Sequence, residues 1–385
     1  MEQVASFTRR EILTILALFI VTRIALVVIG AVAVTVLPST EGPEFKHLLD
    51  GNPALDMWYR WDAGFYATIA IEGYDWYNER QVSADMAFLP LYPLAVHLAS
   101  GLTPTGCALS PYLSTCATIG GLIVSNIALL ASTFLLYDIA KKRMGEQTAI
   151  RAVALLLIAP NMIFLSGVYT EALFLLLCLL TFWLLERDRF AVAVGVACLA
   201  CLTRTVGVAL YPALMWWAWR TPQSRHARLI AAHLPLVVLV GYVLFAGWWV
   251  GDPLAFFQAN SLIWGRSFTS PIEAFTVYFS GEQIAIFGFR PAWIDLAATI
   301  AYLILAILVW RQNRMWGVFA LAAILIPIAT GTLWSMPRFG AVVFPFYIVL
   351  AAWSDRLWKQ AIVYGASAAL ALLFITRFVT WRWIA

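Results

Sequence analysis

Long apolar runs separated by short polar turns constrain this chain more than any other feature. A helix needs about 20 mostly apolar residues to cross a bilayer, and only 12% of the residues are charged while 62% are hydrophobic. So few charges cannot cover a water-facing surface. The sequence therefore predicts an all-α polytopic membrane protein with about ten or eleven transmembrane helices, forming one membrane domain over residues 1–385. The apolar runs lie at residues 12–37, 117–140, 149–166, 170–186, 190–203, 206–220, 229–250, 293–310, 315–333, 340–354 and 360–381.

Lysine and arginine residues predict the orientation of these helices. Arg9 and Arg10 precede the first run and place the N-terminus in the cytoplasm. If residues 86–101 do not cross the membrane, the basic turns between the later helices also fall on the cytoplasmic side. We therefore expect residues 88–102 to form a juxtamembrane helix on the outer face. The basic turns contain Lys141, Lys142, Arg143, Arg187, Arg189, Arg220, Arg225, Arg228, Arg311, Arg314, Arg356 and Lys359.

Two long polar intervals, residues 38–116 and 251–292, then become extracytoplasmic loops, and the first is expected to carry juxtamembrane helices. The cytoplasmic turns are too short for a nucleotide-binding domain, and no G-x-x-x-x-G-K-[ST] motif occurs, so an ATP-driven pump is not expected. The formal charge of +4 is spread over many turns and does not support nucleic-acid binding. In an oxidising compartment, Cys107 and Cys116 of the first loop are candidates for a disulfide.

The first loop holds an acid in an aromatic setting. Residues 60–66 read Arg-Trp-Asp-Ala-Gly-Phe-Tyr, and the spacing puts Asp62 and Tyr66 on one face of a short helix. A carboxylate at the membrane surface is partly desolvated, which suits a general base for a sugar hydroxyl. Aromatic faces such as that of Trp61 are platforms for sugars. The alternative is a helix-start acid stabilised by the helix dipole, and spacing alone favours this alternative.

Further charged residues fall at the expected outer ends of helices. Glu171 begins an apolar helix, where an acid is costly unless it has a partner or a function, or simply lies at the interface. Arg204, Arg266 and Arg338 share this predicted side. The arginine fork suits phosphate oxygens, although each arginine alone is better explained by contact with lipid headgroups. The presence of all three on one side favours a phosphate site.

Metal and hydrolase chemistry have no support in the sequence. The four histidines are not at metal-ligand spacing, and no HExxH or DxD-type cluster occurs, so we expect neither a catalytic metal nor a cofactor. No GxSxG motif occurs either.

An ordered set of motifs from about residue 10 to 355 resembles the PIG-V-like mannosyltransferases, which are the family of the second GPI mannosyltransferase and its prokaryotic relatives, in the GT-C class of membrane glycosyltransferases. One motif departs from the family pattern, because Arg204-Thr-Val-Gly replaces a more polar Arg-Ser-Asn-Gly-like turn. The matching pieces are Trp61-Asp62, Gly73-Tyr74, Phe88-Leu-Pro-Leu-Tyr-Pro93, Tyr169-Thr-Glu-Ala-Leu-Phe174, Arg204-Thr-Val-Gly207, Gly251-Asp-Pro-Leu-Ala-Phe-Phe257, Arg338-Phe339 and Phe344-Pro345.

The resemblance implies a GT-C architecture and an inverting, metal-independent transfer of mannose on the extracytoplasmic side. The donor would be polyprenyl- or dolichyl-phosphate mannose, and the acceptor a glycolipid, glycan or protein. Asp62 would be the general base, and the arginines would bind the donor phosphate. The expected location is the inner cell membrane in a prokaryote or the endoplasmic reticulum membrane in a eukaryote. The expected substrate-binding residues are Trp61, Tyr66, Tyr92, Tyr169, Glu171 and Trp264.

Two other functions remain open at this stage. A glycolipid transporter or flippase would use the same arginines and aromatic residues for binding, without needing Asp62 as a base. A non-catalytic subunit of a glycosylation complex is the third possibility.

Overall fold

The computed structural model describes residues 7–40, 52–74, 84–101, 115–222, 224–280 and 292–384, and these residues form helices and connecting turns without a β-strand. They gather into two compact units. Unit 1 comprises Met1–Ile71, Tyr92–Leu179 and Phe346–Ile384, and unit 2 comprises Glu72–Leu91 and Leu180–Pro345. The prediction of one integral membrane domain stays a prediction.

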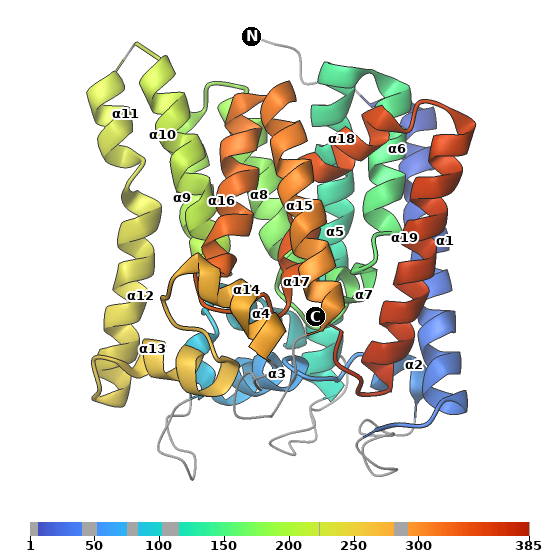
Figure 1. Cartoon of the computed structure of the whole chain (residues 1–385), viewed down its shortest axis with the longest axis horizontal. Coiled ribbons are helices and arrows are strands. Elements are labelled where there is room, and N and C mark those ends of the chain that lie inside the picture. Colours follow the sequence, from blue (N-terminus) through green and yellow to red (C-terminus); the bar gives the residue numbers. More distant parts are fainter. Residues whose placement is uncertain are drawn as a thin grey trace. The chain divides into compact units, whose positions relative to one another are not determined.

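In unit 1, four long helices α1, α5, α6 and α19 run alongside one another (Figure 1). The helix α1 starts where the Thr8 hydroxyl accepts the Glu11 N–H at 3.3 Å and the Glu11 carboxylate accepts the Thr8 N–H at 2.8 Å. This capping box satisfies donors that a helix start leaves open. The helices with residues in unit 1 are α1 (Arg9–Val36), α2 (Pro53–Asp56), α3 (Ala63–Glu72), α4 (Leu91–Ser100), α5 (Thr115–Met144), α6 (Glu146–Leu157), α7 (Met162–Ser166), α8 (Glu171–Leu185), α18 (Pro345–Trp353) and α19 (Leu357–Val379).

The apolar run 149–166 is broken in the structure, because α6 ends at Leu157 and α7 begins only at Met162. Pro160 explains the break, since proline has no N–H to donate and disfavours helical backbone before it. The break leaves carbonyls at the end of α6 without helical donors. Arg23 of α1 supplies one donor, because its guanidinium bonds to the Leu157 carbonyl at 2.5 Å and to the Ser166 hydroxyl. Both acceptors are uncharged groups of the protein, so Arg23 ties α1 to the broken segment.

In unit 2, α15 packs against α16 and α17, α9 against α12, and α10 against α16 (Figure 1). The expected run 206–220 begins as a 3-10 turn and continues as an α-helix. The elements of unit 2 are η2 (Ala84–Ala87), α9 (Phe190–Cys201), η3 (Thr205–Ala209), α10 (Leu210–Arg220), α11 (Arg225–Ala231), α12 (Leu234–Val250), α13 (Ala255–Gln258), the π-turn η4 (Ala259–Ile263), α14 (Pro271–Ser280), α15 (Trp293–Gln312), α16 (Arg314–Ile328) and α17 (Met336–Ala341).

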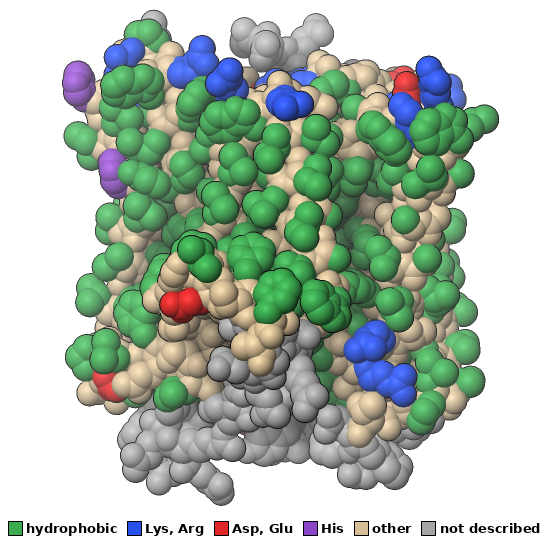
Figure 2. All heavy atoms as spheres, viewed as in Figure 1, with side chains coloured by type: hydrophobic (Ala, Val, Ile, Leu, Met, Phe, Trp, Pro, Cys, Tyr) green, Lys and Arg blue, Asp and Glu red, His purple; other side chains and the backbone are tan. Residues whose placement is uncertain are grey.

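The surfaces of the long helices are apolar. Figure 2 shows hydrophobic side chains along α12 and α15, with lysine and arginine side chains over the α10–α11 and α15–α16 turns. Among the described residues, five helical stretches are long and apolar enough to cross a membrane, namely Arg9–Val36, Thr115–Met144, Arg225–Val250, Trp293–Gln312 and Leu357–Val379. The predicted class, an all-α multi-pass membrane protein, is confirmed. The finer count of ten or eleven spans stays a prediction, because the other apolar helices are shorter.

Both expected short helices of the first loop are present. The helix α3 begins at Ala63, directly after Asp62. The helix α4 begins at Leu91, with Pro93 in its first turn, where a missing N–H costs nothing. His97 of α4 forms a 2.7 Å hydrogen bond with the Ala70 carbonyl of α3, which ties the two helices together. Cys116 is disulfide-bonded, while the predicted partner Cys107 lies outside the described residues.

Candidate active site

Three arginines of the predicted phosphate site lie close together in unit 2. Arg204 stands in extended backbone just before η3, Arg266 follows the π-turn η4, and Arg338 lies on α17. The guanidinium carbons of Arg204 and Arg266 lie 5.4 Å and 4.9 Å from the centre of the Phe339 ring. Arg338 is adjacent to Phe339 in the chain and only 6% exposed. The Phe339 ring thus brings together cations from two separate segments, as cation–π attraction favours, and the charges of Arg204 and Arg338 are both close enough to act on Arg266.

Arg266 is held by its surroundings. Its guanidinium donates to the Thr330 hydroxyl at 2.8 Å and to the Trp334 carbonyl. Burial, together with the nearby charges of Arg338 and Arg204, lowers the pKa of Arg266 to about 10, while Asp295 and Tyr278 act in the opposite direction. Arg266 still carries its charge at neutral pH. Clustered, partly desolvated cations repel one another unless an anion is present, so the cluster is suited to bind one.

Asp295 and Tyr278 were not among the predicted site residues. Asp295 lies in the first turn of α15, and Tyr278 lies near the end of α14. A sequence signal for Asp295 existed, because an acid at the end of an apolar span is expensive and usually functional. Tyr278 had no such signal, since a tyrosine in a polar loop is ordinary.

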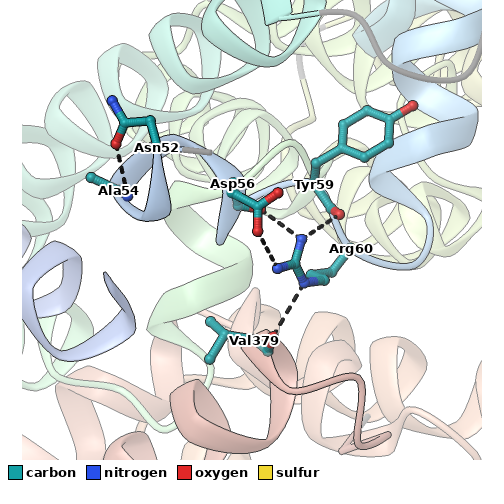
Figure 3. A network of polar contacts seen from close by, with 6 residues as sticks. All are labelled: Asn52, Ala54, Asp56, Tyr59, Arg60 and Val379. Atoms are coloured by element: carbon teal, nitrogen blue, oxygen red, sulfur yellow. Dashed lines mark hydrogen bonds and ion pairs between the residues drawn. The ribbon is translucent and has the colours of Figure 1, made fainter. Parts of the chain in front are cut away.

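Asp62 lies in unit 1, at a strongly restrained point of the chain. Just before it, Asp56 and Arg60 form a 2.6 Å ion pair with both side chains fully buried (Figure 3). Arg60 also donates to the carbonyls of Asp56 at 2.7 Å, Tyr59 at 3.0 Å and Val379 at 3.2 Å. These bonds fasten the segment before Asp62 to the end of α19.

Trp61, predicted to be a sugar platform, packs against the C-terminal segment. Its ring centre lies 5.3 Å from that of Trp381 and 5.0 Å from that of Trp383. The Trp61 backbone has φ of 55°, in the left-handed region that bulky residues seldom adopt. Such a conformation persists only where the surroundings impose it, and it is common at functional sites.

Tyr66, Tyr92 and Tyr169 form a buried cluster in unit 1. The ring of Tyr66 lies 5.1 Å from Tyr92 and 6.3 Å from Tyr169. The Tyr92 hydroxyl bonds to Ser125 at 2.9 Å, and the Tyr169 hydroxyl donates to the Arg60 carbonyl at 2.8 Å. Burial raises the pKa of Tyr92, and Glu171 is close enough to contribute. The bonds of Tyr92 and Tyr169 within the protein favour positioning over direct contact with a substrate.

Glu171 and Trp264 complete the predicted set. Glu171 is the first residue of α8 and is fully buried. Trp264 lies in unit 2, with its ring centre 5.2 Å from that of Phe88. Among the described residues, no three His, Cys, Asp or Glu side chains are grouped so that they could hold a metal ion. Metal independence stays a prediction.

The model of the family described as "Mannosyltransferase (PIG-V)" matches residues 10–268 of the chain. The chain belongs to this PIG-V mannosyltransferase family. The match contains Asp62, Glu171, Arg204 and Arg266, whereas Arg338 lies beyond it. The resemblance stated from the sequence motifs is therefore confirmed at the level of the family.

This PIG-V family member is also similar to individual proteins. It is 31% identical over 150 residues to GPI mannosyltransferase 2 of Cryptococcus neoformans var. neoformans serotype D, a match that covers 39% of this chain and 34% of the relative. The matched segment thus spans about a third of the curated relative's length.

Among solved structures, ArnT from Cupriavidus metallidurans bound to undecaprenyl phosphate aligns with a TM-score of 0.52 at 13% identity, over 94% of this chain and 75% of ArnT. ArnT in the apo state aligns with a TM-score of 0.48 at 15% identity, over 95% and 75%. Because the identity is so low, the similarity to ArnT bound to undecaprenyl phosphate concerns the fold alone. This fold agrees with the GT-C architecture expected for the PIG-V family.

Proposed function

We propose that this chain is a glycosyltransferase that moves a hexose, with mannose as the expected sugar, from a polyprenyl- or dolichyl-phosphate donor to an acceptor hydroxyl on the extracytoplasmic face. Membership of a mannosyltransferase family supports the reaction class. The observation that carries the proposal is the close approach of Arg204 and Arg338 to Arg266, with Arg204 and Arg266 both over the Phe339 ring. The ArnT structure supports the donor class, because that protein is bound to undecaprenyl phosphate.

The chemistry follows from the charge change at the phosphate. In an inverting displacement, the acceptor oxygen bonds to the anomeric carbon while the bond from that carbon to the phosphate oxygen breaks. The electron pair stays with the lipid phosphate, so a singly charged diester becomes a more highly charged monoester. Fixed arginines stabilise charge that develops in this way without a metal ion.

Asp62 is the proposed general base, which takes the proton of the acceptor hydroxyl. Its position supports this role, because it stands at the start of α3 after a segment fastened by the buried Asp56–Arg60 pair. A rigid approach matters for a base, since small displacements cost much of the rate. The proposed substrate-binding residues remain Trp61, Tyr66, Tyr92, Tyr169, Glu171 and Trp264, and the hydroxyls of Tyr92 and Tyr169 are also held by bonds within the protein.

The donor site is tested by titrating purified protein in nanodiscs with polyprenyl-phosphate mannose. Arg204→Ala and Arg338→Ala each remove a charge-assisted contact with the phosphate, so we expect donor binding to weaken by about 10- to 100-fold. Acceptor binding should weaken less than donor binding in both variants. Arg314→Ala is the matched control, because Arg314 stands at the start of α16, in the basic α15–α16 turn. Unchanged donor affinity in both site variants would remove the phosphate role.

The base is tested by transfer of radiolabelled mannose to a membrane lipid extract. Asp62→Asn keeps the side-chain shape, and is expected to reduce turnover by about 100-fold or more while donor binding remains. Asp355→Asn is the control, since Asp355 is exposed and pairs with Lys359 at 2.7 Å. A protein whose Asp62→Asn variant moves the lipid across the membrane as well as the wild type would instead be a transporter. A wild-type protein that binds donor and forms no product with any acceptor extract would point to a non-catalytic subunit.

A further inference from the structure

Asp295 and Tyr278 are buried polar residues that the proposed roles leave unused. Asp295 is 1% exposed and Tyr278 is 8% exposed. In the described part of the chain, neither the Oδ1 atom of Asp295 nor the Tyr278 hydroxyl has a hydrogen-bond partner. Burying such an atom without a partner costs several times what a hydrogen bond contributes, and native proteins contain few of them. Two such unpartnered atoms near the same arginine indicate that a polar group of a ligand binds between them.

The fold directs both side chains inward. On α14, Ala274 and Tyr278 are four residues apart and both buried, whereas Ile272 and Phe279 are 70% and 76% exposed. Asp295 lies in the first turn of α15, which packs against α17. The contact between α15 and α17 is close, because the Tyr302 hydroxyl donates to the Pro337 carbonyl at 3.2 Å.

The two residues border the arginine cluster. The side chains of Arg338, Arg204, Asp295 and Tyr278 lie close enough to the Arg266 guanidinium to act on its charge. Asp295 and Tyr278 also lie close enough to act on one another, while the Oδ1 atom of Asp295 and the Tyr278 hydroxyl are left without a hydrogen-bond partner in the described part of the chain. Any phosphate bound by the arginines therefore has this polar pair beside it. In a lipid-phosphate sugar, the sugar is joined directly to the phosphate, so its hydroxyls lie next to the phosphate oxygens.

We propose that Asp295 and Tyr278 bind a hydroxyl group on the sugar of the lipid-phosphate donor. This assignment rests on the proposed function. A sugar hydroxyl can donate its proton to Asp295 Oδ1 and accept the proton of Tyr278, so a single ligand group satisfies both. A second phosphate oxygen would not, because an ionised phosphate has no proton for the Asp295 carboxylate and is repelled by it. The pair would thus select the sugar, while the arginines select the phosphate.

The test compares two lipids, polyprenyl-phosphate mannose and polyprenyl phosphate without a sugar, titrated against the full-length protein in nanodiscs. The readout is the ratio of the two dissociation constants, which cancels changes in phosphate binding. We expect Tyr278→Phe and Asp295→Asn each to reduce the preference for the sugar-bearing lipid by about tenfold, as expected for loss of one hydrogen bond to a buried group. The matched control is Tyr211→Phe, because the Tyr211 hydroxyl bonds within the protein, to His233 at 3.0 Å.

A second readout separates ligand binding from a structural role. Removing an unpartnered buried hydroxyl is expected to leave the melting temperature of the lipid-free Tyr278→Phe protein unchanged or higher. A lower melting temperature would overturn the assignment, because the hydroxyl would then stabilise the fold. If both variants keep the wild-type preference for the sugar-bearing lipid, the assignment of Asp295 and Tyr278 is also overturned. The proposed function would survive that result as long as the wild-type protein binds polyprenyl phosphate. A wild-type protein that binds neither lipid would overturn the proposed function itself.

Discussion

The hydroxyl of Tyr169 donates a 2.8 Å hydrogen bond to the backbone carbonyl of Arg60, two residues before Asp62. Both side chains are fully buried. Tyr169 also precedes Glu171, the first residue of α8, by two positions. A bond between residues 109 positions apart therefore links the two acid-bearing segments of unit 1.

This bond predicts the behaviour of Tyr169→Phe. The substitution removes one of two donors to the buried Arg60 carbonyl, which keeps the Ala63 N–H at 3.2 Å, so we expect a loss of about 0.5–1.5 kcal/mol of stability. Because the segment before Asp62 loosens, we expect turnover to fall about tenfold while the dissociation constant for the donor stays the same. Steady-state transfer and donor titration measure the two quantities, with Tyr211→Phe as the control. Weaker donor binding at unchanged turnover would contradict a positioning role.

The Asp56–Arg60 pair predicts a large loss of stability when one partner is removed. Both side chains are fully buried, so Asp56→Asn leaves the Arg60 charge uncompensated. Breaking such a pair costs about 3–5 kcal/mol, whereas replacing both partners by apolar residues costs less. Thermal unfolding in detergent should rank the wild type above Asp56→Leu/Arg60→Met, and that double variant above Asp56→Asn. The exposed pair of Asp355 and Lys359 serves as the control, with no measurable loss expected in Asp355→Asn. A fully stable Asp56→Asn protein would contradict this account.

Gly340 lies on α17, two residues after Arg338, at the contact between α17 and α15. The position of Arg338 should therefore depend on how closely these two helices pack. A Cβ atom at Gly340 would lie 2.0 Å from the Tyr302 ring, so Gly340→Ala must push α17 away from α15. We expect a loss of about 1–3 kcal/mol from overpacking, together with weaker donor binding. Shortening the opposing side chain in Gly340→Ala/Tyr302→Ala should recover part of the donor affinity. In α9, Gly195→Ala is the control, since nothing lies within 4 Å of its added Cβ. Normal donor binding by Gly340→Ala would show that α17 does not need this close approach.

Metal removal tests the proposed mechanism. The charge on the leaving phosphate is assigned to arginines, so transfer should persist after dialysis against EDTA. Mannose transfer measured with and without added Mg²⁺ or Mn²⁺ checks this expectation. Activity that disappears with EDTA and returns with either ion would require a metal role that the arginine cluster does not supply.

The predicted orientation is tested by cysteine labelling of intact cells with a membrane-impermeant maleimide. Phe268 lies in the second loop predicted to be extracytoplasmic and is 80% exposed, whereas Leu357 follows Arg356 of a turn predicted to be cytoplasmic and is 84% exposed. We expect Phe268→Cys to react from outside and Leu357→Cys to react only after permeabilisation. The native Cys178, Cys198 and Cys201 are buried and should give little background. The reverse pattern would invert the whole topology.

The local features of this protein were predictable from the sequence. Apolar runs in a chain with few charges must form helices, because lipid offers no hydrogen-bond partners to the backbone. The short helices α3 and α4 were also predictable, since Asp62 and the prolines at 90 and 93 act within one turn of the helices they begin. Exceptions are the break after Leu157, where Pro160 interrupts a run that was read as continuous, and the break in the run 340–354, where α17 ends at Ala341 and α18 begins at Pro345.

The sequence by itself determined the membrane class, the family and the candidate charges. Only the tertiary structure decided which charges meet. Arg204, Arg266 and Arg338 come from segments far apart in the chain, and they converge because cations and the Phe339 ring are brought together by helix packing. Packing also turned Trp61 towards Trp381 and buried Asp295 beside Arg266. Such contacts depend on the summed shape of many side chains, whereas helix formation depends on a few neighbouring residues.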